Sequence, residues 1–154
     1  MTVIKSMDID LFKKDYDAIL ALRNYSSTLH FPASTEDEIR AYNERALSQV
    51  ADYMAEGKAF FWGAYEDDRL IGLLWTYPRV FFNERRLFVN SIVVSPDAQR
   101  RGIGRSLMNA CFVYGREKGY DAVDLTVMPN NEKALGLYEN MGFTSERIQM
   151  RRAL

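Results

Sequence analysis

The sequence predicts a mixed α+β fold, with one domain over residues 1–154 and a mixed, mostly antiparallel central sheet flanked by helices. Apolar residues recur at helical spacing before residue 57 and again after residue 102. The stretch between them is rich in the apolar and aromatic residues that are typical of strands. The length of 154 residues and the hydrophobic content of 47% suit one globular domain. No repeat or linker interrupts it.

The first part of the chain predicts a short strand followed by a helix. Val3 and Ile4 favour a strand at Thr2–Ser6, and the apolar spacing from Leu11 to Leu22 predicts a helix that ends near Asn24. The turn-forming residues of Tyr25–Ala33 predict a loop.

A second helix is predicted to begin at Ser34 or Thr35. Thr35 and Glu38 match the capping box, in which the two side chains bind the free N–H groups at a helix start. The helix is expected to run to about Glu56 and to end at Gly57.

The middle of the chain predicts three strands. Ala59–Tyr65 and Arg69–Tyr77 flank the polar turn Glu66–Asp68, so they form a hairpin that Pro78 is expected to end. The third strand is expected over Leu87–Val94.

The last part predicts helix, strand, helix and strand. The first helix runs from Ile103 to Lys118, and the strand Ala122–Val127 follows. Asn131–Met141 is a short helix, with Asn131 as N-cap and Gly142 after its end. Arg147–Leu154 is expected to be a final strand.

Composition excludes several classes of function. With 20 Lys+Arg, 21 Asp+Glu and a net charge of −1, the chain has no general affinity for nucleic acid or anionic membranes. One cysteine, Cys111, and one histidine, His30, cannot form a disulfide framework or a Cys/His metal site, so no metal is expected. The apolar runs are too short for a signal peptide or a membrane span, so we expect a cytoplasmic protein.

The segment Val94–Gly104 has the features of an anion-binding loop. It leads from a strand into a helix whose free N–H groups and dipole attract anions. Gly102 and Gly104 keep side chains away from such an anion, and Arg100, Arg101 and Arg105 add positive charge at its rim. A tight turn with solvated arginines is the alternative.

Two common nucleotide motifs fit this loop poorly. A Walker A motif needs glycine where Gln99 stands and lysine where Arg105 stands. The Rossmann fingerprint needs a third small residue where Leu107 stands.

Two motifs together resemble the GNAT superfamily of N-acyltransferases. Gln99, Gly102 and Gly104 match Q/R-x-x-G-x-G/A, and Asn131–Phe143 matches N-x-x-A-x-x-L-Y-x-x-x-G-F. The resemblance covers about residues 87–154. It implies a GNAT-type domain in which strands four and five splay apart to hold acyl-CoA, with acetyl-CoA as co-substrate.

The resemblance also implies roles for individual residues. Tyr138 would be the general acid that protonates the leaving thiolate, because an ordinary tyrosine is protonated at neutral pH. A core tyrosine is the alternative. The residues expected to bind acetyl-CoA are the strand-four residues Ile92, Val93 and Val94, the loop residues Gln99, Arg100, Arg101, Gly102, Ile103, Gly104 and Arg105, and Asn131.

The general base is left open by the sequence. Asn90 and Ser91 occupy the strand-four positions where the family often has a glutamate, so we expect proton removal through water, with Glu84 as one candidate. Cys111 is expected to be a buried, inert thiol rather than the nucleophile of a covalent mechanism.

The predicted function is transfer of an acetyl group from acetyl-CoA to a primary amine by direct attack in a ternary complex. The acceptor is a small molecule or peptide, and a homodimer is an option. The alternatives are a non-catalytic acyl-CoA-binding module and a protein that binds ATP or NAD. The acceptor site is expected between the N-terminal helices and the central hairpin, with aromatic candidates His30, Phe31, Trp62, Trp75, Tyr77, Phe81 and Phe82.

Overall fold

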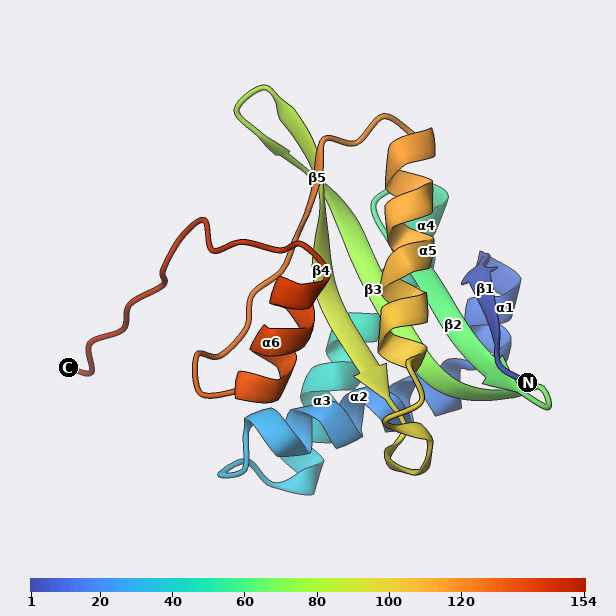
Figure 1. Ribbon diagram of the computed structural model, residues 1–154. Helices are drawn as coiled ribbons and strands as arrows, with labels where there is room; N and C mark the ends of the chain where they lie inside the picture. Colours follow the sequence, from blue (N-terminus) through green and yellow to red (C-terminus); the bar gives the residue numbers. More distant parts are fainter.

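The computed structural model describes residues 1–154 and shows one five-stranded sheet with helices on both faces (Figure 1). The strand order is β1-β2-β3-β4-β5, antiparallel throughout except for the parallel pair β4 and β5. The strands are β1 (Val3–Met7), β2 (Phe60–Glu66), β3 (Arg69–Phe81), β4 (Glu84–Val94) and β5 (Ala122–Asp124). The predicted α+β class and mostly antiparallel sheet are confirmed.

The helices form two layers around this sheet. The first contains α1 (Ile9–Lys14), α2 (Tyr16–His30), α3 (Glu36–Leu47) and α4 (Val50–Ala55), and the second contains α5 (Ile103–Glu117) and α6 (Glu132–Asn140). Each layer encloses its own apolar core. None of the helices combines the length and apolar character that crossing a bilayer requires.

The first predicted helix is two helices, α1 and α2, and α2 extends further than predicted. The loop expected at Tyr25–Ala33 is helical as far as His30, so that prediction is wrong over this stretch. Thr28 Oγ1 donates to the Asn24 carbonyl at 2.9 Å, a bond that a helix accommodates. Asn43 Nδ2 also donates to Ser27 Oγ at 3.2 Å, so contact with α3 stabilises the extra turn.

The second predicted helix is two helices. Its start is confirmed, because Thr35 Oγ1 accepts from the Glu38 N–H at 3.1 Å. The chain then breaks at Ser48 and Gln49 before α4, so the single helix to Glu56 is wrong. The break lets Leu47 and Val50 both enter the core.

The central hairpin is confirmed but longer than expected. Asp67 and Asp68 both adopt positive φ (49° and 61°), as a tight hairpin turn requires. Pro78 does not end β3, which pairs with β4 as far as Phe81. The partner strand β2 begins at Phe60, opposite Thr76, and does not reach Pro78. Pro78 therefore has a neighbouring strand on one side only, and its missing N–H is tolerated. For the same reason β4 begins at Glu84 rather than Leu87.

A β-bulge at Asn90 divides β4 into two halves. Trp75 pairs with Ser91 but Thr76 pairs with Val89, which leaves Asn90 as the extra residue. Val89 therefore packs in the core beneath α5 on one side of the bulge, and Ile92 packs there on the other.

The end of the chain departs most from the prediction. β5 stops at Asp124 instead of Val127, and residues 147–154 form no strand. Figure 1 shows this segment leaving the body of the protein, and Ile148 and Met150 are exposed. A strand needs a neighbouring strand to pair with, and none lies beside this segment.

The segment after α6 is held by the buried Arg86. Its guanidinium donates to both oxygens of Glu146 at 2.7 and 2.9 Å, to Asp124 at 3.1 Å and to Glu84 at 2.8 Å. These carboxylates raise the pKa of Arg86, and the hydrogen bonds from Arg86 lower the pKa of Glu146.

We expect Arg86→Met to lower the Tm and to speed proteolysis of residues 141–154. Because the pKa of Glu146 is lowered in the fold, this pair stabilises the protein above the ordinary glutamate pKa of about 4.3 and loses its effect as the pH falls. The Tm difference between wild type and variant should therefore shrink below about pH 4. An equal difference at pH 7 and pH 3 would contradict this account of the pair.

Candidate active site

The loop before α5 presents a row of free backbone donors. None of the N–H groups from Gln99 to Arg105 donates a hydrogen bond within the protein. Arg100 and Gly102 adopt positive φ (64° and 75°), which turns successive amides toward a common side. The loop can therefore bind an anion with its backbone.

Two glycines let this loop lie close to the sheet and leave space beside it. A Cβ on Gly72 of β3 would lie 3.1 Å from Ile103 Cγ2, so this glycine permits the close approach of α5. A Cβ on Gly104 would meet only Val94 Cγ2, at 4.0 Å. The space around Gly104 is thus not filled by the protein itself.

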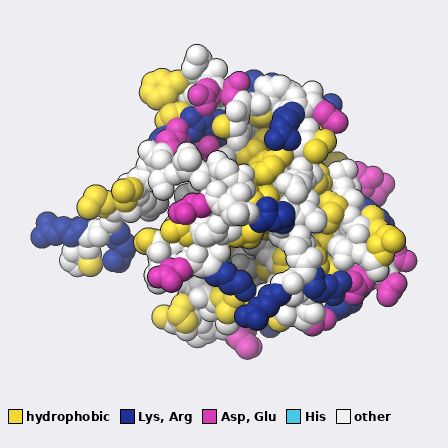
Figure 2. Space-filling view, viewed as in Figure 1, with side chains coloured by type: hydrophobic (Ala, Val, Ile, Leu, Met, Phe, Trp, Pro, Cys, Tyr) yellow, Lys and Arg dark blue, Asp and Glu magenta, His cyan; other side chains and the backbone are white.

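The side chains of the loop point in different directions. Arg101 pairs with Glu66 of the β2–β3 turn, and Arg105 donates to Asn140 of α6 at 2.8 Å. Arg100 has no partner within the protein and is exposed. Figure 2 shows Lys and Arg side chains gathered over this loop and the first turn of α5.

Gln99 connects the loop to its surroundings. Its Nε2 donates to the Val94 carbonyl at 3.2 Å and to the Tyr25 hydroxyl at 3.1 Å. The loop is thereby fixed both to the end of β4 and to α2.

Strands β4 and β5 diverge next to this loop. They pair only from Arg86 opposite Ala122 to Phe88 opposite Asp124, and beyond Phe88 β4 pairs with β3 alone. Figure 1 shows the chain after β5 turning away from β4 toward α6. The predicted splay is confirmed, and the backbone of Ile92, Val93 and Val94 lies along its open edge.

Tyr138 lies on α6 in the same layer as α5. Its ring packs edge-on against Phe143 at 5.7 Å, and its hydroxyl makes no hydrogen bond within the protein. Burial raises the pKa of this phenol, so it keeps its proton at neutral pH. Asn131 caps the same helix by accepting from the Ala134 N–H at 3.2 Å.

Cys111 and His30 do not take part in this arrangement. Cys111 is fully buried on the inner face of α5, and burial raises the pKa of its thiol to about 12, which confirms that the thiol is buried as expected. His30 is exposed in the last turn of α2, where its Nδ1 lies 2.8 Å from the Ser26 carbonyl oxygen.

The face of the sheet covered by α2 and α3 includes residues that sequence reasoning did not identify. Arg23 and Asn43 are buried there, and Arg23 lies against Trp75. Trp62, which the sequence placed among acceptor-site candidates, instead packs on the opposite face against Tyr114. Glu84, the candidate for water-mediated proton removal, is paired with Arg86.

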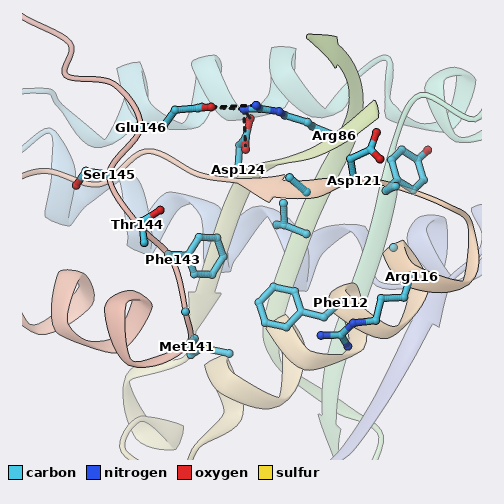
Figure 3. Close-up of a pocket in the computed structure, with 15 residues that line it drawn as sticks. Arg86, Phe112, Arg116, Asp121, Asp124, Met141, Phe143, Thr144, Ser145 and Glu146 are labelled. Atoms are coloured by element: carbon cyan, nitrogen blue, oxygen red, sulfur yellow. Dashed lines mark hydrogen bonds and ion pairs between the residues drawn. The ribbon is translucent and has the colours of Figure 1, made fainter. Parts of the chain in front are cut away.

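A pocket of about 490 Å³ opens beside β5 and is separate from the loop before α5. Figure 3 shows Arg86, Asp124 and Glu146 joined at one end of it and Phe112, Phe143 and Met141 toward the other. Its polar end is the ion-pair network of Arg86, so these groups have their partners within the protein.

Comparison with known families gives the affiliation of the chain. The profile of the Acetyltransferase (GNAT) family matches residues 21–143, which include the loop, the splayed strands and α6. The chain belongs to the GNAT acetyltransferase family. The resemblance drawn from the two motifs is therefore confirmed.

Among curated relatives of this GNAT chain, the mycothiol acetyltransferase of Rhodococcus jostii is 35% identical over 67% of the chain and 35% of the relative. That of Propionibacterium freudenreichii is 28% identical over 91% of the chain and 44% of the relative. Human N-acetyltransferase 8 is 28% identical over 59% of the chain and 41% of the relative. The chain thus spans less than half the length of these relatives.

Solved structures share the fold of this GNAT chain. A GCN5-related N-acetyltransferase from Ralstonia eutropha superposes with a TM-score of 0.78 at 19% identity, over 100% of this chain and 99% of the other. An aminoglycoside N-acetyltransferase in complex with CoA gives 0.72 at 21% identity, over 99% and 95%. These likenesses show the fold.

Proposed function

We propose that this protein is an N-acetyltransferase that transfers the acetyl group of acetyl-CoA to a primary amine by direct attack in a ternary complex. Residues 1–154 would form one such domain. A single thiol without a disulfide partner suits the reducing cytoplasm, where we place the reaction.

One observation carries the proposal: the unpartnered amides from Gln99 to Arg105 lie at the end of β4, where that strand has lost its neighbour β5. The amides suit a pyrophosphate, and the open strand edge suits an extended arm with amide groups of its own. Coenzyme A has both parts. In this proposal Ile103 and Gly104 contribute amides, Arg100 contributes charge, and the backbone of Ile92–Val94 binds the arm.

Bound acetyl-CoA supplies a thioester, whose carbon the amine nitrogen attacks as the C–S bond breaks. In this proposal a backbone N–H of β4 polarises the thioester carbonyl. Tyr138 donates its phenolic proton to the departing sulfur, since its raised pKa keeps that proton available. Asn131 positions α6 through its cap.

Proton removal from the amine is assigned to water. Glu84 and Asp124 are the carboxylates near the splayed strands, and both are bound by Arg86. Because the Arg86 guanidinium already occupies these carboxylates, ordered water held by polar groups such as Ser91 is the better route.

We expect acetyl-CoA and CoA to raise the Tm, because a ligand that binds only the folded state stabilises it by about 2.7 kcal/mol at one hundred times its Kd. ATP and NAD should have no such effect, since the loop matches neither of their motifs. Thermal unfolding with each ligand tests this expectation.

Release of free CoA in the presence of a panel of primary amines then tests the transfer itself. Stabilisation by acetyl-CoA without CoA release from any amine would instead support the non-catalytic acyl-CoA-binding module. Stronger stabilisation by ATP than by acetyl-CoA would overturn both the proposed transferase and the acyl-CoA-binding module.

A further inference from the structure

Arg23 of α2 is a buried cation without a counter-charge. The residue is 9% exposed, and its guanidinium makes one hydrogen bond, from Nη2 to Asn43 Oδ1 at 3.2 Å. Its Nε is buried without a partner, and no ion pair of the protein includes it. Burial without a nearby carboxylate lowers its pKa.

The other buried arginine of this protein has negatively charged partners. Arg86 is 7% exposed and is bound by three carboxylates, those of Glu84, Asp124 and Glu146. An unpaired buried charge is costly to the fold, so its presence calls for a compensating role. Arg23 therefore lacks the carboxylate partners that Arg86 has.

The acceptors around Arg23 are neutral groups that already receive hydrogen bonds within the protein. The Asn43 amide oxygen accepts from Arg23, and its nitrogen donates to Asn24 at 2.9 Å and to Ser27 at 3.2 Å. Trp75 lies under the guanidinium, with 4.9 Å from Arg23 Cζ to its ring centroid, and its Nε1 is buried without a partner. The cluster thus has spare N–H donors and no negative charge.

The position of this cluster relates it to the proposed reaction. Trp75 pairs in register with Ser91 of β4, one residue before the Ile92–Val94 edge assigned to the thioester arm. The loop before α5 and Tyr138 lie in the layer on the other face of the sheet, so an amine meets the thioester from the α2 side. Arg23 is on that side.

We infer that Arg23 binds a carboxylate of the acceptor, so that the acceptor is an amine that also carries a carboxylate, such as an α-amino acid. The inference rests on the proposed function. A guanidinium can donate two parallel hydrogen bonds to one carboxylate, and Asn43 and Trp75 hold Arg23 in place for it. The same uncompensated charge repels polycationic acceptors.

The test compares free amino acids with their primary amides as acceptors in the CoA-release assay. Leucine, phenylalanine, glutamine and lysine are each paired with their amide, which keeps the α-amine and side chain but lacks the negative charge. We expect the acids to be favoured by about 10- to 100-fold in kcat/KM, the usual effect of a hydrogen-bonded charge pair. The amide's amine is less basic and more often unprotonated, so simple reactivity opposes this result.

Arg23→Met should bring the acid-to-amide ratio close to one. Arg45→Met is the matched control, because Arg45 is an exposed arginine of α3 outside the cluster, and its ratio should stay at the wild-type value. Should Arg23→Met fail to fold, Arg23→Lys, which keeps the charge but not the paired donors, should lower the ratio. Amides used as well as acids by wild type, or a preference that survives in a folded Arg23→Met, would overturn the inference.

A binding measurement separates this inference from the proposed function. N-acetylphenylalanine and its amide are added with CoA, and the Tm is recorded without any need for turnover. We expect only the acid to stabilise wild type, and the effect to vanish in Arg23→Met. If only the acid stabilises wild type and no amine gives CoA release, the carboxylate site is supported and the transferase is refuted. If CoA is released from the amides alone, the transferase is supported and the carboxylate site is refuted.

Discussion

Tyr138→Phe is expected to lower kcat by about 10²- to 10⁴-fold, the range typical of a lost general acid. The ring packs against Phe143 and keeps that contact when only the hydroxyl is removed. The hydroxyl makes no hydrogen bond within the protein, so the Tm and the acetyl-CoA affinity should be unchanged. CoA release under saturating substrates, with thermal unfolding alongside, measures both effects.

Two control variants make this experiment specific. Tyr114→Phe removes another half-buried hydroxyl of the same layer, toward the far end of α5, and should turn over normally. Cys111→Ala should also retain its chemistry once any loss of stability is corrected for, because the thiol is buried and protonated. Normal turnover by Tyr138→Phe together with an inactive Cys111→Ala would replace direct transfer with a covalent mechanism.

Gly104→Leu is expected to weaken acetyl-CoA binding by about 100-fold or more, the effect of losing two hydrogen bonds to a charged group. The fold has room for a Cβ at this position, which would meet only Val94 Cγ2 at 4.0 Å. Leucine also favours a helix more than glycine does. The Tm without ligand should therefore hold while the Kd, measured by calorimetry, rises.

Gly136→Leu is the matched control for this change. Gly136 is likewise a helical glycine with open space around a Cβ, but it lies on the exposed side of α6. An equal loss of affinity in both variants would show that a general effect on the helices, rather than the loop amides, is responsible.

The features that depend on neighbouring residues in the chain could be predicted from the sequence. The Thr35 cap, the Asp67–Asp68 turn and the Asn131 cap each need only residues a few positions apart, and all three are confirmed. The splay of β4 and β5 could be predicted only because two motifs together resembled a family. The roles of Tyr138 and the loop residues remain predictions.

The errors arise where tertiary contacts decide the structure. The last turns of α2 persist because Asn43 of α3 binds Ser27, and Pro78 remains in β3 because β2 does not reach it. Neither contact can be read from adjacent residues. Residues 147–154 have a strand-like sequence, but without a neighbouring strand they pair with nothing.

Arg23 was missed for a similar reason. In the sequence it is an ordinary helical arginine between Leu22 and Asn24, and nothing local shows that it is buried. The spacing of Ile19, Leu22 and Arg23 on one helical face is a signal that could have found it, because it places a cation on the apolar stripe.

The bulge at Asn90 changes which residues of β4 face α5. Toward the carboxyl end the even-numbered Ile92 lies under α5, whereas before the bulge the odd-numbered Leu87 and Val89 lie there. If Asn90 were instead paired as an ordinary strand residue, every side chain on one side of it would exchange faces, as a frameshift changes every codon that follows it. The guanidinium of Arg86 would then enter the apolar layer and Leu87 would leave it. The extra residue at the bulge therefore keeps Leu87, Val89 and Ile92 on the same face of the sheet.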